Sequence, residues 1–283
     1  MLIHYCWFGS GKKSELIKKC IHSWREFCPD AEIIEWNENN FDVNCCTYVK
    51  EAYARKKWAF VSDYCRYYVL YHFGGIYLDT DVELIRKLEG LPETFVGFEY
   101  GAQYVSSALI RGAKKHDEIC GMMLASYEDD RFILGDGSFN MRTVGVRETE
   151  IFLKAGLKQE DYLQHICGTV IYPTEYFCPY NFFSGQLKIT KKTYSIHHYE
   201  ASWLTAKQKD AVKLTNRLSN YLPTKMAYYL SLFYKSIEYD GVFFTLKKTI
   251  RILKKISNCP NDFQKCYKEH FTELVQNDVE FKT

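Results

Sequence analysis

The stretch Gly74–Asp81, with the sequence GGIYLDTD, decides the fold class because it joins a helix end, a strand and two carboxylates. The preceding segment, Phe60–Phe73, is predicted to be helical, and the paired glycines that follow are a typical helix stop. Ile76–Leu78 is a short apolar run of the kind found in buried strands, and it ends directly in Asp79 and Asp81. A helix that leads into a buried strand is typical of α/β proteins.

Short strands and helices alternate on both sides of this stretch. The further strands that we expect are Leu2–Phe8, Glu32–Trp36, Phe95–Phe98 and Ser106–Ile110, and the further helices are Ser14–Phe27 and Val49–Arg55. Glycines close the first strand, and Pro29 lies just beyond the first helix. The sequence therefore predicts an α/β fold with a mostly parallel sheet flanked by helices.

The composition is that of a globular protein with no strong overall charge. Of the 283 residues, 47% are hydrophobic and 25% are charged, which excludes wholesale disorder. The 37 basic residues nearly balance the 35 acidic ones, so no global field marks a nucleic-acid-binding protein. Near the C-terminus the balance shifts, since residues 206–256 contain 11 basic residues and 3 acids. We predict an α/β domain at residues 1–205 and a basic helical region at residues 206–283.

The cysteines and the apolar runs bear on the cellular compartment. The 11 cysteines are scattered without any C-x-x-C pair, so the spacing does not indicate a structural zinc site. The N-terminus lacks a basic region followed by an apolar one, and no run of apolar residues is long enough to span a membrane. We expect a cytoplasmic protein with reduced thiols, and leave open a peripheral association with the inner face of the membrane.

Two pairs of charged residues carry the candidate chemistry. Asp79 and Asp81, two residues apart at a strand end, can approach one divalent cation, although two solvated carboxylates that open a loop are the simpler explanation. A metal in that position stabilises a departing nucleoside diphosphate. Asp63 and Arg66 share one face of the preceding helix. They form either a surface salt bridge or a pair that contacts sugar hydroxyls and phosphate.

The segments Ala59–Tyr68 and Gly74–Asp81 together resemble the D-x-D region of glycosyltransferases with the GT-A fold. The pattern S-D-x-x-R…G-G-x-Y-x-D-x-D is similar to that of glycosyltransferase family 32, which includes the yeast initiating α-mannosyltransferase and bacterial capsule and lipopolysaccharide enzymes. The clostridial glucosylating toxins share the pattern. The resemblance covers residues 1 to about 205, thinly between residues 83 and 193. It implies that the α/β domain is a GT-A catalytic domain with a C-terminal helical extension.

Two flanking segments extend the resemblance. Ile3–Gly9 resembles the opening strand of the family, which implies that Trp7 stacks on the nucleotide base; filling the core is the alternative. Ser195–Trp203 resembles the closing His-x-x-x-x-Ser-Trp segment, which implies a histidine metal ligand. In a strand, His197 and His198 point to opposite faces, so only one of them is expected to enter the site, and we prefer His197.

Carried over position by position, the resemblance implies a full set of site residues. Donor-sugar or phosphate contacts are expected from Ser62, Asp63, Arg66, Tyr77 and Asp79, base stacking from Trp7, a lid from Trp203, and a metal site from Asp79, Asp81, His197 and Ser202. The catalytic residues among them are Asp63, Arg66, Asp79 and Asp81. Arg142–Val146 resembles a Thr-Gly-Pro acceptor loop, but Val146 replaces the proline, and Gly135–Gly137 is either the tip of that loop or a simple turn.

The resemblance implies a metal-dependent, retaining hexosyltransferase that uses Mn²⁺ or Mg²⁺ in surface polysaccharide biosynthesis. A UDP-sugar is the preferred donor and GDP-mannose the second choice. The acceptor is a saccharide or a lipid-linked saccharide, and no nucleic-acid partner is expected.

Two other classes of function stay open. Tyr77–Leu84 also resembles the signature of aspartate-nucleophile phosphatases, although that signature normally lies on the first strand of the fold. A non-catalytic protein that binds membranes is the other alternative. Phe243–Ile256 has an apolar face and a basic face, so it can lie on an anionic membrane or dock on the catalytic domain.

Overall fold

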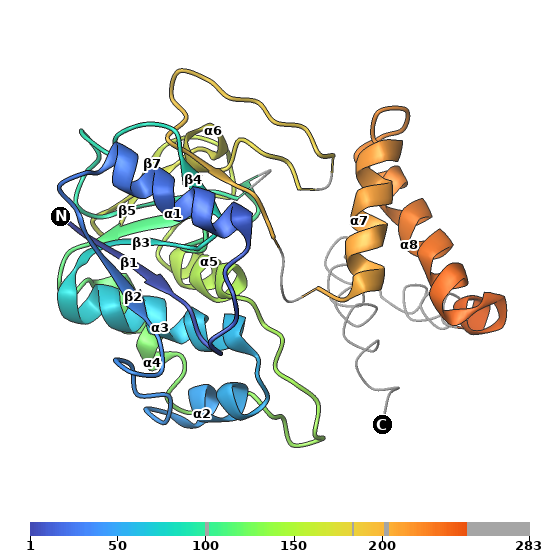
Figure 1. Cartoon of the computed structure of the whole chain (residues 1–283), viewed down its shortest axis with the longest axis horizontal. Helices are drawn as coiled ribbons and strands as arrows, with labels where there is room; N and C mark the ends of the chain where they lie inside the picture. Colours follow the sequence, from blue (N-terminus) through green and yellow to red (C-terminus); the bar gives the residue numbers. More distant parts are fainter. Residues whose placement is uncertain (100–101, 183, 201–203, 248–283) are drawn as a thin grey trace. The chain divides into compact units, whose positions relative to one another are not determined.

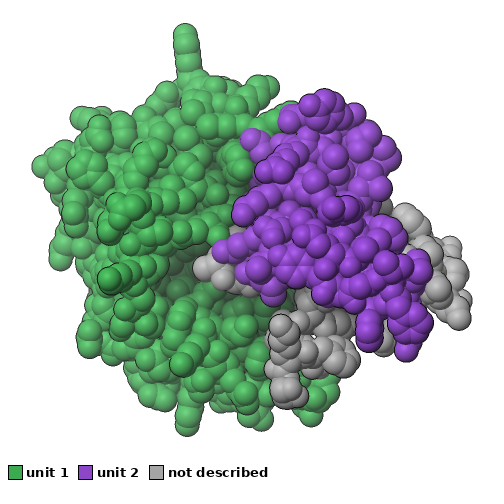
Figure 2. Space-filling view, turned by 45° about the vertical axis from the view of Figure 1, so that its right-hand side comes forward, with its two compact units in different colours: residues 1–181, 186–203 green, residues 182–185, 204–283 purple. Residues whose placement is uncertain are grey.

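The structure, a computed structural model, describes residues 1–99, 102–182, 184–200 and 204–247. The chain divides into two compact units (Figure 2). Unit 1 comprises residues 1–181 and 186–203, and unit 2 comprises residues 182–185 and 204–283. The domain division that we expect at residue 205 stays a prediction, because compactness alone does not show that either part folds independently.

A mixed sheet of seven strands forms the centre of unit 1, with the order β2-β1-β3-β6-β5-β8-β7. Its strands are β1 (Leu2–Cys6), β2 (Glu32–Trp36), β3 (Gly75–Leu78), β5 (Phe95–Gly97), β6 (Ile110–Ala113), β7 (Gln164–Ile166) and β8 (Thr169–Tyr172). Strand β1 is parallel to β2 and β3, and β5 is parallel to β8, whereas β6 is antiparallel to β3 and β5, and β7 to β8. Five of the seven strands therefore point the same way, which confirms the predicted mostly parallel α/β fold.

Helices cover both faces of this sheet (Figure 1). They are α1 (Glu15–Phe27), α2 (Thr47–Ala54), α3 (Trp58–Phe73), α4 (Glu118–Ala125), α5 (Val144–Lys154) and the short α6 (Thr174–Phe177). Alternate residues of β1 enter different core clusters: Ile3 and Tyr5 pack in the cluster that contains α1, and Cys6 packs in the cluster that contains α2 and α3. This alternation is why one short strand needs a helix on each side.

A second, two-stranded sheet is built by β4 (Val82–Leu84) and β9 (Ser195–His197), which pair antiparallel. Helix α1 holds β4 in place through two hydrogen bonds. The buried Trp24 indole donates to the carbonyl of Val82 at 2.7 Å, and the amide of Leu84 donates to the Ser23 hydroxyl at 2.9 Å. The chain just before β4 carries the D-x-D carboxylates, so these bonds fix the start of the candidate site.

The paired glycines between α3 and β3 are required by the backbone. Gly74 has φ +67°, and a Cβ at this position would lie 2.9 Å from the amide nitrogen of Lys115. Gly75 has φ +101°, and a Cβ there would lie 2.8 Å from the carbonyl oxygen of Leu2. Only glycine meets both the positive φ and the close approach, so the chain can turn directly from the helix into the central strand.

Two expected elements differ from the structure. The bounds of the strand expected at Ser106–Ile110 are wrong, because β6 covers Ile110–Ala113. Residues 107–109 form a turn instead, in which the amide of Leu109 donates to the carbonyl of Ser106 at 3.2 Å. The predicted loop at Arg142–Val146 becomes the start of α5 from Val144 onward.

The described cysteines are free thiols. Six of them are buried, namely Cys6, Cys20, Cys28, Cys65, Cys120 and Cys178. Buried free cysteines behave as small hydrophobic residues, which is the role that we expected for most of them. Cys259 and Cys266 lie outside the described residues.

In unit 2, α7 (Ala206–Leu218) and α8 (Thr224–Asp240) form an antiparallel hairpin. Lys207 at the start of α7 pairs with Asp240 at the end of α8. Thr205 caps α7 in a capping box with Gln208. Residues 242–247 are also helical, and the rest of the predicted amphipathic segment lies outside the described residues. Of the helices in the described ranges, none combines the length and the apolar character needed to cross a membrane.

Candidate active site

Two acidic side chains and one histidine meet just beyond the C-terminal end of β3. The carboxylates of Asp79 and Asp81 and one imidazole nitrogen of His197 lie within 4.8 Å of one another. Asp79 and Asp81 follow the central strand directly, and His197 is brought opposite Val82 by the antiparallel pairing of β4 and β9. In α/β sheets, the carboxyl ends of the strands are the usual place for a ligand.

The two neighbouring histidines point in opposite directions, as the strand geometry predicts. His197 is buried, and its Nε2 lies 3.2 Å from Oδ1 of Asp81. His198 instead places its Nε2 2.7 Å from a carboxylate oxygen of Glu83, which also pairs with Lys19. The structure thus brings His197, and not His198, to the D-x-D carboxylates.

The electrostatics of the three groups favour a bound cation. Burial raises the pKa of Asp79, Arg66 opposes this effect, and the negative charge of Asp81 adds to it. Burial would also raise the pKa of Asp81, but His197 and the backbone N–H of Glu200 outweigh it and hold that pKa at about 2. The repulsion from Asp81, which raises the pKa of Asp79, is the effect of two carboxylates that share one site. A divalent cation would relieve their mutual repulsion.

The donor set fits a divalent metal of the manganese type. Two carboxylates and one imidazole are the mixed oxygen and nitrogen ligands that Mn²⁺ accepts. The Nδ1 atom of His197 is buried and, within the described part of the chain, has no hydrogen-bond partner. No hydrogen bond from the described residues to Nδ1 therefore turns the imidazole away from the carboxylates, and its Nε2 faces Asp81. Asp79, Asp81 and His197 are the residues that would hold the ion.

Arg66 lies behind the D-x-D and is almost fully buried, with 3% of its side chain exposed. Its Nη2 is 2.9 Å from Asp63 and 3.3 Å from Asp79, and its guanidinium carbon lies 4.9 Å from the centre of the Tyr77 ring. The surface salt bridge that we left open for Asp63 and Arg66 is thus ruled out, because this pair is interior. Burial raises the pKa of Asp63 to about 6 although Arg66 opposes the shift.

Two features of this cluster leave it ready for a ligand. The Tyr77 hydroxyl donates to Asp79 at 2.9 Å and orients that carboxylate. The Nη1 atom of Arg66 is buried and has no hydrogen-bond partner among the described residues. A buried guanidinium nitrogen without a partner is unusual, since such groups cost free energy unless they are paired. This nitrogen is a natural donor to an anionic or hydroxyl oxygen of a bound ligand.

The other predicted site residues differ in how they are placed. Ser62 donates its hydroxyl to the carbonyl of Trp58 at 3.1 Å, one turn earlier in α3. Trp7 is half-buried; its indole N–H donates to Gly11 at 2.8 Å, and Lys13 lies 5.0 Å from the ring centre. Ser202 and Trp203, the expected additional ligand and lid, lie outside the described residues.

Sequence reasoning missed the half-buried Trp58 beside Gly9. Gly9 has φ +83°, and a Cβ there would meet the Trp58 ring at 2.4 Å. The Trp58 ring, from the start of α3, therefore packs against the loop that follows β1 and contains Trp7. The glycine after Trp7 was the available signal, because it marks a close approach, but the partner that approaches lies far along the chain.

A second missed residue is Glu99, which follows the parallel strand β5 at the same edge of the sheet as Asp79. Burial raises the pKa of its carboxyl, while Ser106 and His197 oppose the shift and the charge of Asp79 adds to it. The charges of His197 and Asp79 thus act on this carboxyl. Its position after an apolar strand was the only sequence signal, since no D-x-D-like pattern surrounds it.

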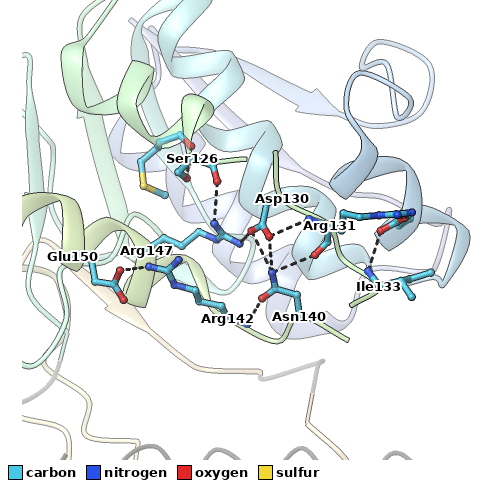
Figure 3. A network of polar contacts seen from close by, with 10 residues as sticks. Ser126, Asp130, Arg131, Ile133, Asn140, Arg142, Arg147 and Glu150 are labelled. Carbon is cyan, nitrogen blue, oxygen red and sulfur yellow. Dashed lines mark hydrogen bonds and ion pairs between the residues drawn. The ribbon is translucent and has the colours of Figure 1, made fainter. Parts of the chain in front are cut away.

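A polar network anchors the segment that leads from α4 to α5 (Figure 3). Arg147 pairs with Asp130 and donates to the carbonyl of Ser126 at 3.3 Å. Asn140 donates to Asp130 at 3.1 Å, and this bond joins the two ends of the loop between them. The turn at Gly135–Gly137 lies between these anchors and is exposed. Its role as an acceptor loop stays a prediction.

Comparison with known proteins bears on the enzyme class. Residues 14–96, which contain α3, β3 and both aspartates, match the family described as a glycosyltransferase sugar-binding region containing a DXD motif. This match supports a glycosyltransferase, the class that the sequence predicts. A solved chain titled PaToxG Glycosyltransferase is similar at 20% identity over 54% of this chain and 68% of that chain, with a TM-score of 0.42. A likeness this distant adds no argument about the site. Among curated proteins, none is significantly similar to the chain.

Proposed function

We propose that the chain is a metal-dependent, retaining hexosyltransferase that uses a nucleotide sugar in surface polysaccharide biosynthesis, as a member of glycosyltransferase family 32. The observation that carries the proposal is the convergence of Asp79, Asp81 and His197 at the end of β3, with Arg66 behind them. A UDP-sugar is the preferred donor and GDP-mannose the second. The bound cation, Mn²⁺ or Mg²⁺, would supply a Lewis acid for the diphosphate of the donor.

The residues around the cation would bind and orient the donor. The buried Nη1 of Arg66 donates to an oxygen of the donor sugar or phosphate, and Asp63 accepts from a sugar hydroxyl. The half-buried Trp7 offers a π-face to the base. In transfer with retention, the bond from the anomeric carbon to the diphosphate breaks, and the acceptor oxygen attacks from the same face. The acceptor proton then passes to the departing phosphate.

Hydrolysis of the donor in the absence of an acceptor tests this proposal. We expect the full chain to release sugar from a UDP-sugar when Mn²⁺ is present and to stop when the metal is chelated. GDP-mannose serves as the second donor in the same assay. Release that persists undiminished in chelator would contradict the metal site.

The phosphatase alternative predicts a different product in that assay. Such an enzyme uses the first aspartate of its signature as a nucleophile. Here Asp79 accepts a hydrogen bond from Tyr77 and pairs with the buried Arg66. These contacts favour a role for Asp79 as a fixed metal ligand over a role as a nucleophile. Release of phosphate from a generic phosphate ester, without any cleavage of a nucleotide sugar, would favour the phosphatase.

A specific observation in unit 2 supports an anionic membrane surface as a further partner, next to a saccharide or lipid-linked acceptor. Phe243 and Phe244 are 74% and 66% exposed, and Tyr234 on α8 is 59% exposed. Large exposed aromatic side chains that gather with basic residues are typical of proteins that bind at a membrane interface. We propose peripheral attachment on the cytoplasmic side through the segment that begins at Phe243.

Vesicle flotation of the full chain tests this attachment. We expect the chain to float with vesicles that contain phosphatidylserine but not with phosphatidylcholine alone, since anionic lipid attracts the basic residues. The double variant Phe243→Glu/Phe244→Glu should float at least about 10-fold less, because charge opposes insertion of both side chains. Tyr162→Glu, at a position in unit 1 that is 42% exposed, is the matched control and should float like the wild type. A wild-type chain that stays unbound would contradict the proposal.

A further inference from the structure

The orientation of the His197 imidazole poses a question that its hydrogen bonds do not answer. Histidines that bind metals usually donate their second ring nitrogen to a carboxylate, a carbonyl or water, and this bond fixes the ring. In this chain the Nδ1 of His197 is buried and, among the described residues, has no such partner. Some other contact must hold the ring so that its Nε2 faces Asp81.

The contact that covers the ring is Tyr199. The ring centres of His197 and Tyr199 are 3.9 Å apart, with 38° between the two planes. In a regular strand, residues two apart lie about 6.6 Å from each other along the chain, so their rings do not normally stack this closely. The strand ends at His197, and the chain bends so that the phenol ring lies over the imidazole.

The backbone of Tyr199 makes this bend possible. Its φ is +51°, a left-handed conformation that a bulky residue adopts only where the surroundings impose it. The far end of the side chain is also fixed, because the hydroxyl lies 2.9 Å from the Sγ of the buried Cys178. Tyr199 is thus held at its backbone and at its tip, with the ring between them against His197.

The same bend also fixes a second candidate ligand. On one side of Tyr199, the amide of His198 donates to the carbonyl of Asp81 at 3.0 Å. On the other side, the amide of Glu200 donates to Oδ2 of Asp81 at 2.8 Å. Tyr199, with its left-handed backbone, lies between these two donors. The turn at Tyr199 therefore directs the amide of His198 to the backbone carbonyl of Asp81 and the amide of Glu200 to its carboxylate.

We propose that Tyr199 is a positioning residue of the candidate metal site, which orients His197 through its ring and Asp81 through the turn at its backbone. This inference rests on the proposed metal-dependent function. It concerns how the site is held ready for a cation and not which residues bind the cation. The ring and the turn make separate contributions, and substitutions can separate them.

Calorimetric titration of the full chain with Mn²⁺, without any nucleotide sugar, measures these contributions. Tyr199→Phe keeps the ring but loses the contact of the hydroxyl with Cys178, so we expect Mn²⁺ to bind about 3-fold more weakly. Tyr199→Leu removes the aromatic ring, and we expect Mn²⁺ to bind about 10- to 100-fold more weakly, as is usual when the support of a ligand is lost. Tyr199→Gly favours the left-handed backbone but has no ring, so its loss should be about 10-fold and smaller than that of the leucine variant.

Controls distinguish positioning from general stability. Tyr176→Leu alters a half-buried aromatic residue of the same core cluster, whose ring lies 4.7 Å from that of Tyr172, and should leave the Kd for Mn²⁺ unchanged. Urea unfolding of each variant reports the structural cost separately. If neither the leucine nor the glycine variant folds, Cys178→Ala replaces them, because it removes the thiol that contacts the Tyr199 hydroxyl and leaves the ring. Binding of Mn²⁺ that is about 3-fold weaker supports the proposal, and an unchanged Kd overturns it.

The outcomes separate this inference from the proposed function. If the wild-type chain binds Mn²⁺ and the leucine and glycine variants bind it with the same Kd as the wild type, the role of Tyr199 is overturned and the proposed metal site is not affected. Variants that lose stability without any change in the Kd overturn it in the same way. A wild-type chain that does not bind Mn²⁺ overturns both the metal site and this inference.

Discussion

Asp81→Asn is expected to reduce Mn²⁺-dependent hydrolysis of a UDP-sugar by about 1,000-fold or more, which corresponds to about 4 kcal/mol of lost transition-state stabilisation. Asp81 lies within reach of both Asp79 and His197, and its carboxylate accepts from the backbone of Glu200 at 2.8 Å. Asparagine keeps an oxygen that can accept this bond but loses the negative charge that attracts the cation. The rate of sugar release at saturating Mn²⁺ measures the effect, and circular dichroism checks the fold.

Glu83→Gln is the matched control for this variant. Glu83 lies two residues further along the chain, but its carboxylate faces Lys19 and His198 and not the candidate metal site. The same chemical change at this position should leave hydrolysis within about 2-fold of the wild type, because Glu83 pairs with Lys19 and His198 and does not contact the candidate metal ligands among the described residues. Equal rates for Asp81→Asn and the wild type would contradict the metal assignment.

Arg66→Ala is expected to destabilise the protein by about 3–5 kcal/mol, because it leaves the buried carboxylate of Asp63 and the partly buried carboxylate of Asp79 without their shared partner. The guanidinium lies within 3.3 Å of both Asp63 and Asp79 and is 3% exposed. Urea unfolding at pH 8 measures the loss. Arg131→Ala is the control, since Arg131 also pairs with a glutamate, Glu51, but is 65% exposed; it should cost at most about 1 kcal/mol.

The pH dependence of this loss gives a second check. The pKa of Asp63 is about 6 in the folded protein, above its value in an unfolded chain. The native state therefore binds a proton more tightly than the unfolded state does, and protonation favours folding as the pH falls through about 6. Removal of Arg66 raises this pKa further, so the stability deficit of Arg66→Ala should be smaller at pH 5 than at pH 8. A deficit no larger than that of Arg131→Ala at either pH would contradict the buried ion pair.

The sequence predicted the parts of the fold that depend on local patterns. The helix end at Gly74, the strand that follows it and the carboxylates at its end are adjacent in the chain, and their order indicates an α/β sheet. The alternation of side chains along a strand predicted that only one of His197 and His198 enters the site, and the structure places His197 beside Asp81. The prediction at Ser106–Ile110 was wrong because an apolar run does not show where a turn ends and the strand begins.

The parts of the site that the sequence did not predict depend on contacts between distant residues. The approach of Trp58 to Gly9 brings two separate elements together. The stacking of Tyr199 on His197 needs a left-handed backbone at a tyrosine, which no residue preference would indicate. The burial of Arg66 follows from tertiary packing around α3, whereas its spacing from Asp63 equally fits an exposed helix face.

The stability of the full chain with nucleotide sugars, with and without Mn²⁺, tests the central claim most directly. A ligand at 100 times its Kd stabilises the folded state by about 2.7 kcal/mol, which raises Tm by about 5 °C in a protein of this size. We predict this rise from a UDP-sugar only when Mn²⁺ is present, in addition to any rise that Mn²⁺ alone causes, and no rise from the sugar in chelator. An equal rise with a UDP-sugar in chelator, or no rise with any nucleotide sugar in Mn²⁺, would contradict a metal-dependent nucleotide-sugar site.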